Sequence, residues 1–148
     1  MSSGVRELRV WQEAVALAGD VVRAAKQGMR RETRCVTESI MMSALSVAAH
    51  IADGYARVTP AEQRDSYLSA KRALLRVETE LAVAKHADLL PAGSFAELTV
   101  RSGHVAKLVA GYLAYLDRQI AEGANPYPPA THGADGSAAS PGFARVPS

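Results

Sequence analysis

The positions of the seven prolines divide this 148-residue chain more sharply than any other feature. Five of them follow residue 123, and the other two are Pro60 and Pro91. Proline breaks helix interiors because it lacks an N–H group and its ring clashes with the preceding turn. Long stretches without proline, interrupted at only two places, therefore predict long helices with two marked joints.

The end of the chain differs in composition from the rest. Residues 124–148 are rich in Pro, Gly, Ala and Ser, and Asp135 and Arg145 are the only Asp/Glu and Lys/Arg residues among them. Such a segment cannot bury enough apolar surface to offset the entropy lost on ordering. We therefore expect one domain over residues 1–123 and a disordered, inert extension over residues 124–148.

Apolar residues recur at steps of three and four in two segments before Pro60, which is typical of one face of a helix. The first segment, residues 5–26, precedes Gly28, which tolerates a left-handed cap. The second, residues 35–53, carries two neighbouring apolar stripes and many alanines, so we expect it at the centre and ended by Gly54. The stripe of the first segment is Leu8, Trp11, Val15, Ala18, Val22 and Ala25. In the second segment, the first stripe is Val36, Ile40, Ala44, Val47 and Ile51. The second stripe there is Met41, Leu45, Ala48 and Ala52.

Two further segments begin with the pattern of a capping box, in which a hydroxyl residue precedes a glutamate by three positions. Thr59 and Glu62 flank Pro60 at the first helical position, and Ser94 and Glu97 repeat the pattern after Pro91. The third stripe is Tyr67, Ala70, Leu74, Val77, Leu81 and Ala84. The fourth is Phe95, Leu98, Val105, Val109, Tyr112 and Leu116, widened by Leu108, Leu113 and Ile120. Four helices with short joints and no strand pattern predict an all-α, antiparallel up-down-up-down four-helix bundle.

The composition excludes several classes of protein. One cysteine rules out a disulfide framework, and a net charge of +2 gives no general affinity for polyanions. No apolar run approaches the ~20 residues of a membrane span, and the N-terminus lacks the apolar core of a signal peptide. We therefore expect a cytoplasmic protein that does not associate with a membrane.

Candidate catalytic and metal-binding groups are sparse. His50 and Asp53 share a helix face, but a metal would need further ligands, so we expect no metal and no cofactor. Cys35 stands beside Arg34 without a neighbouring histidine, and no glycine-rich phosphate loop occurs. We expect a protein that is not an enzyme.

Basic residues gather in two places. Arg64, Lys71, Arg72 and Arg76 recur in the third segment, where their spacing predicts one basic edge beside the apolar stripe. Arg30, Arg31 and Arg34 surround the joint between the first two segments. A charged edge of this kind is either a solvated face balanced by neighbouring acids or a surface for nucleic-acid phosphates. The pattern alone leaves both interpretations open.

Two motifs resemble those of a known family. Leu8, Trp11 and Gln12 resemble the L-x-V-W-Q opening of the 23S rRNA intervening-sequence family of four-helix bundle proteins. Ser46, His50, Ile51, Ala52, Asp53, Gly54 and Arg57 resemble its S-I-x-x-N-I-A-E-G-x-x-R signature. His50 stands where the family has Asn and Asp53 where it has Glu. The basic third segment is similar to that of the related accessory protein of diversity-generating retroelements.

The resemblance implies what the protein does and with what it assembles. It implies a ring-like homopentamer without enzymatic activity, with RNA, DNA or a reverse transcriptase as a further partner. We therefore expect a self-associating, nucleic-acid-associated or reverse-transcriptase accessory protein. The alternative is a purely structural homo-oligomer that has no role with nucleic acid.

Overall fold

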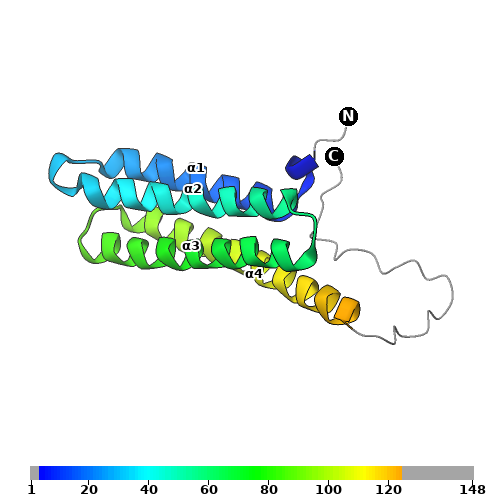
Figure 1. The fold of residues 1–148 in the computed structure, drawn as a ribbon. Helices are drawn as coiled ribbons and strands as arrows, with labels where there is room; N and C mark the ends of the chain where they lie inside the picture. The colour runs from blue at the N-terminus through cyan, green and yellow to red at the C-terminus, as the bar shows by residue number, and fades with distance from the viewer. Residues whose placement is uncertain (1–3, 125–148) are drawn as a thin grey trace.

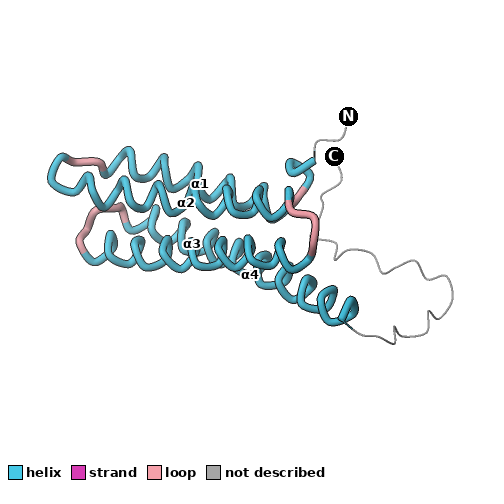
Figure 2. Tube along the Cα trace, viewed as in Figure 1, coloured by secondary structure: helices cyan, strands magenta, loops and turns pink. Residues whose placement is uncertain are grey.

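The computed structural model describes residues 4–124, and this part of the chain is entirely helical (Figures 1 and 2). Four α-helices account for most of it, with two short 3-10 turns before α1 and α2. The predicted tail, residues 124–148, lies outside the described residues except for Ala124. The elements are η1 (Gly4–Glu7), α1 (Arg9–Gly28), η2 (Arg31–Thr33), α2 (Arg34–Ala56), α3 (Pro60–His86) and α4 (Ala92–Ala124).

The helices form the predicted antiparallel four-helix bundle. Each helix packs against the next one along the chain, and α4 returns to contact α1. Short joints force consecutive helices to run in opposite directions, as Figure 1 shows. The C-terminal end of α4 leans away from α1 and α2 in the same view.

The centre of the bundle is built from the predicted stripe of α3 and the first predicted stripe of α2. The second predicted stripe of α2 is not buried, since Met41, Ala48 and Ala52 are half-buried and Leu45 is 50% exposed. All six residues of the third stripe are buried, as are Ile40, Ala44, Val47 and Ile51 of α2. The largest of these side chains is Tyr67, whose ring stacks on Tyr112 of α4 with centroids 4.4 Å apart. Burial, and secondarily Tyr112, raises the pKa of Tyr67 well above its ordinary value of 10.0.

The predicted inward stripe of α1 is only partly correct. Leu8, Ala18 and Ala25 are buried, but Trp11 and Val22 are half-buried and Val15 is 40% exposed. Apolar residues occupy two adjacent stripes of α1, and periodicity alone does not show which of the two faces the core. The smaller side chains of the other stripe allow α1 to approach the centre closely, which leaves the Trp11 ring at the edge. That buried stripe is Val10, Ala14, Leu17, Val21 and Ala24.

The predicted start of α3 is confirmed, and that of α4 is wrong. The Thr59 side chain accepts a hydrogen bond from the Glu62 N–H at 3.2 Å, with Pro60 at the first helical position. By contrast, α4 begins at Ala92, so Ser94 lies inside the helix rather than at its cap. The Pro91 carbonyl already accepts from the Phe95 N–H at 3.1 Å, which closes the first turn earlier.

Neither predicted helix-ending glycine acts as a left-handed cap. Gly28 is the last residue of α1, but a Cβ there would clash with the Leu89 carbonyl oxygen of the α3–α4 joint. Gly54 is buried inside α2, which continues to Ala56. A Cβ on Gly54 would lie 2.8 Å from Cε2 of Tyr67. Both glycines therefore permit close approach of neighbouring chain segments, a role that the sequence pattern did not reveal.

One described stretch, Arg31–Ala56, is long and apolar enough to cross a membrane by length and composition. A central helix of a water-soluble bundle meets the same criterion. Here the stretch contains α2, which packs against both α1 and α3 and buries Ile40, Val47 and Ile51. Only 33% of its apolar window is buried inside the structure, and Met42 and Leu45 remain exposed.

Candidate functional site: a polar groove between α2 and α3

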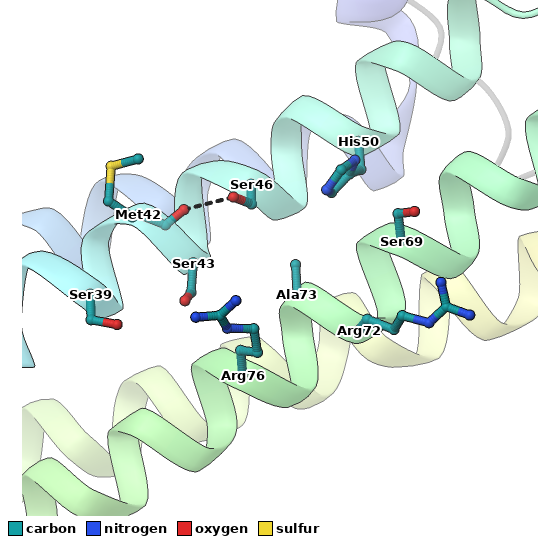
Figure 3. A pocket seen from close by; sticks show the side chains of 9 residues that line it. All are labelled: Ser39, Met42, Ser43, Ser46, His50, Ser69, Arg72, Ala73 and Arg76. Carbon is teal, nitrogen blue, oxygen red and sulfur yellow. Dashed lines mark hydrogen bonds between the residues drawn. The ribbon is translucent and has the colours of Figure 1, made fainter.

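A polar groove of about 310 Å³ follows the seam between α2 and α3 (Figure 3). Residues of α2 at steps of three and four form one wall, and residues of α3 form the other. We call it the α2/α3 groove. Its lining residues are Ser39, Met42, Ser43, Ser46 and His50 from α2, and Ser69, Arg72, Ala73 and Arg76 from α3.

The helical register of α2 explains why this wall is polar. Ser39, Ser43, Ser46 and His50 each immediately precede a residue of the buried stripe. A helix turns by about 100° per residue, so these four side chains lie beside the stripe, at the border with α3. Because serine and Ala73 are small, the seam stays hollow where larger side chains would fill it.

Two guanidinium groups border the groove from α3. Figure 3 shows the Arg76 side chain directed toward Ser43, whereas Arg72 extends along α3 below Ser69. Within residues 4–124, Arg72 makes no ion pair. The Arg76 Nε lies 3.8 Å from the Glu80 Oε1, and the Arg76 side chain is 72% exposed. A loose, exposed pair of this kind holds an arginine weakly, so both cations are accessible to a ligand.

Glu80 ties the two helices together next to the groove. The Ser43 hydroxyl of α2 donates to the Glu80 Oε1 at 2.6 Å. The Glu80 side chain is only 18% exposed, and its Oε2 is buried without a hydrogen-bond partner in the described part of the chain. A carboxylate therefore lies beneath Arg76.

The four cations predicted to share one edge of α3 lie on two edges. The Arg64 Nε contacts the Asp117 Oδ1 of α4 at 2.6 Å, so Arg64 lies on the α4 side. Lys71 is exposed and follows seven residues later, which returns it to nearly the same side. At about 100° per residue, Arg72 and Arg76 are rotated by roughly 80–120° from Arg64 and border α2 instead.

The cations of the first joint lie apart from the groove. Arg30 precedes η2, Arg31 begins it, and both are exposed at the end of the bundle where α1 passes into α2. The Arg34 Nε lies 2.7 Å from the Glu38 Oε1. The structure thus does not bring Arg30, Arg31 or Arg34 together with Arg72 and Arg76.

Beyond His50 the same seam becomes acidic. A second hollow shares His50 and Ser69 with the groove and adds Asp53, Arg57, Glu62 and Asp65. The His50 Nδ1 lies 4.0 Å from the Asp53 Oδ2. No group of three or more His, Cys, Asp or Glu side chains in residues 4–124 could hold a metal ion.

The two motifs that carried the resemblance have separable roles. The polar residues Ser46, His50, Asp53 and Arg57 all face the two hollows along the α2/α3 seam. Ile51 and Gly54 are buried, and Ala52 is half-buried. In the first motif Leu8 is buried and Trp11 packs at the edge of the core. Gln12 donates from Nε2 to the Arg6 carbonyl at 2.7 Å and fixes η1 against α1.

Our reading of the sequence did not identify Ser39, Ser43, Ser69 or Glu80 as site residues. The sequence pattern that could have indicated the groove is the spacing of four polar residues of α2 by three and four positions. This spacing places a polar face on an otherwise apolar helix, and the residues are Ser39, Ser43, Ser46 and His50. The pairing of Ser43 with Glu80 joins two helices and 37 positions of sequence, so helical periodicity could not predict it.

The chain matches the model of one known family over most of its described length. The family model for the 23S rRNA-intervening sequence protein matches residues 6–111, which covers all of α1, α2 and α3 and most of α4. The chain therefore belongs to the 23S rRNA-intervening sequence protein family. No curated protein matches it significantly.

Proposed function

We propose that this protein is a non-enzymatic, self-associating accessory protein of the cytoplasm that contacts nucleic acid through the α2/α3 groove. One observation carries the proposal: Arg72 and Arg76 border a hollow with a row of serine hydroxyls while making no close ion pair within the described chain. Arginine is suited to phosphate because its planar guanidinium donates several hydrogen bonds at once.

The groove suits a phosphate backbone better than base recognition. Its other polar groups are hydroxyls and His50, and no aromatic ring lines it for base stacking. Contacts of this type fix position but carry little sequence information. The acidic hollow beyond His50 repels phosphate, so each subunit offers only a short basic stretch.

Self-association compensates for the low charge of one subunit. Exposed apolar side chains outside the groove include Val15 of α1 and Leu45 of α2, which we call the α1/α2 apolar face. Val15 is 40% exposed and Leu45 is 50% exposed. Exposed apolar patches on a water-soluble chain mark interaction sites. Several copies joined through this face would present several grooves, and multivalency raises avidity without new contacts in each copy.

The resemblance to the retroelement accessory protein supports the remaining parts of the proposal. It supports a homopentamer as the assembled form and a reverse transcriptase as a protein partner. A role beside a reverse transcriptase fits the non-enzymatic character that we propose, because the polymerase would supply the chemistry and the accessory protein a nucleic-acid surface.

The test is a titration of labelled single-stranded RNA and single-stranded DNA by fluorescence anisotropy at about 50 and 200 mM salt. If each subunit neutralises two phosphates, that fourfold rise in salt weakens binding by about sevenfold per engaged subunit. Arg72→Glu with Arg76→Glu should abolish binding without changing helicity or oligomer mass. Lys107→Glu with Arg118→Glu on α4 is the matched control, since it changes charge equally on exposed residues outside the groove.

The second candidate is a structural homo-oligomer that does not bind nucleic acid. The α1/α2 apolar face favours it, because that face needs only another copy to cover it. Under this alternative Val15→Glu with Leu45→Glu dissociates the oligomer, and wild-type protein leaves RNA anisotropy unchanged at low salt. Our proposal requires the same dissociation together with RNA binding by the intact oligomer.

A further inference from the structure

We propose that Glu80 is a built-in counter-anion that competes with phosphate for Arg76 and so limits the affinity of the α2/α3 groove. This inference rests on the proposed function and adds an affinity-determining residue to it. The Glu80 Oε1 is 2.6 Å from the Ser43 hydroxyl and 3.8 Å from the Arg76 Nε.

The geometry makes Glu80 fixed and Arg76 movable. Glu80 is mostly buried and hydrogen-bonded across the seam, whereas the Arg76 side chain is mostly exposed. Their order along α3 also weakens the pair, since an acid four residues after a base opposes the helix dipole. Arg76 can therefore leave Glu80 for a ligand, but Glu80 cannot follow it.

The buried position of Glu80 distinguishes it from the other acids of α3. Glu78 is exposed, does not line the α2/α3 groove and has no ion pair in residues 4–124. Glu80 lies beside the groove in contact with two of its lining residues, Ser43 and Arg76, and its mostly buried charge is screened less than that of an exposed acid. A phosphate that binds Arg76 must overcome both the existing Arg76–Glu80 contact and repulsion from the Glu80 carboxylate.

Glu80→Gln tests the inference. Glutamine preserves the shape and can still accept the Ser43 hydrogen bond, but it removes the charge. We expect RNA affinity to rise about three- to fivefold, the equivalent of one exposed ion pair. Glu78→Gln is the matched control, because it removes the same charge from the same helix and should change affinity by less than about 1.5-fold. Equal effects of the two variants would overturn the inference.

A double-mutant cycle identifies Arg76 as the competing partner. In an Arg76→Ala background, Glu80→Gln should no longer raise affinity, and a full gain there would contradict the mechanism. If Glu80→Gln loses helicity, Glu80→Ala replaces it in the same cycle, because it also removes the negative charge. RNA affinity should then rise with Arg76 present and stay unchanged in the Arg76→Ala background, and a rise in both backgrounds or in neither would contradict the inference.

The outcomes separate this inference from the proposed function. RNA binding by wild-type protein with no difference between Glu80→Gln and Glu78→Gln leaves the proposed function intact and removes the inference. RNA binding by Glu80→Gln but not by wild-type protein would support Glu80 as the charge that limits affinity and contradict the proposed function of the wild-type protein. If neither protein binds RNA at low salt, both are wrong.

Discussion

Substitution of Gly54 tests how closely α2 and α3 approach each other. A Cβ at this position would lie 2.8 Å from Cε2 and 3.0 Å from Cδ2 of Tyr67, and 3.3 Å from Cβ of Ser66. The ring cannot simply move away, because it is buried and stacked on Tyr112 at 4.4 Å. Gly54→Ala therefore forces α2 and α3 apart or displaces the aromatic stack.

The magnitude follows from two opposing terms. Alanine improves helix propensity over glycine by about 1 kcal/mol in a helix interior. Overpacking a close contact costs about 1–3 kcal/mol. Gly19 supplies the reference, because it also lies within a helix and a Cβ there would meet nothing within 4 Å. Gly19→Ala should stabilise by about 0.5–1 kcal/mol, and Gly54→Ala should be about 1–3 kcal/mol less stable than Gly19→Ala.

Urea unfolding followed by circular dichroism measures both free energies of unfolding on the same scale. The slope of each transition shows whether the two variants unfold alike, which makes the comparison valid. If Gly54→Ala stabilises the protein as much as Gly19→Ala does, the close approach of Gly54 to Tyr67 is refuted.

Three further predictions concern stability. Thr59→Ala should cost about 0.5–2 kcal/mol in urea unfolding because it removes the cap of α3, whereas Ser94→Ala should change stability by less than about 0.5 kcal/mol; equal losses would contradict the observed start of α4. Leu81→Ala should cost about 2–5 kcal/mol because it opens a cavity in the core, and the exposed Leu75→Ala should cost less than about 0.5 kcal/mol. Tyr67 has a raised pKa in the folded protein, so the stability it contributes is present below the ordinary pKa of 10.0 and is lost as the pH rises above that value. Tyr67→Phe should reduce this alkaline loss in urea titrations at rising pH, and an unchanged pH profile would show that Tyr67 is not its source.

Much of the fold was predictable because its determinants are local. The stripe of α3 and the Thr59 cap depend on residues within a few turns of one another, and both are confirmed. The predictions fail where the role of a residue depends on its contact with a segment that is distant in the sequence. Gly28 is required by the Leu89 carbonyl of another joint, and Gly54 by Tyr67 of another helix.

The candidate site was predictable only in part, for the same reason. Arg72 and Arg76 were identified from their spacing, but periodicity could not show that Arg64 instead pairs with Asp117, 53 positions away. The sequence led us to predict one stripe on α1, but packing against the other helices buries the neighbouring stripe and leaves Trp11 and Val15 off the centre. Nothing in the spacing of Glu80 indicated its contact with Ser43.

The most direct test of the central claim is the light-scattering mass of the purified protein, measured with and without added RNA at low salt. The account predicts a homo-oligomer, with a mass that is a multiple of the 15.7 kDa chain and rises further when RNA is added. Arg72→Glu with Arg76→Glu should keep the oligomer mass and lose only the increase with RNA. A mass of one chain that RNA does not change would contradict both the self-association and the nucleic-acid contact.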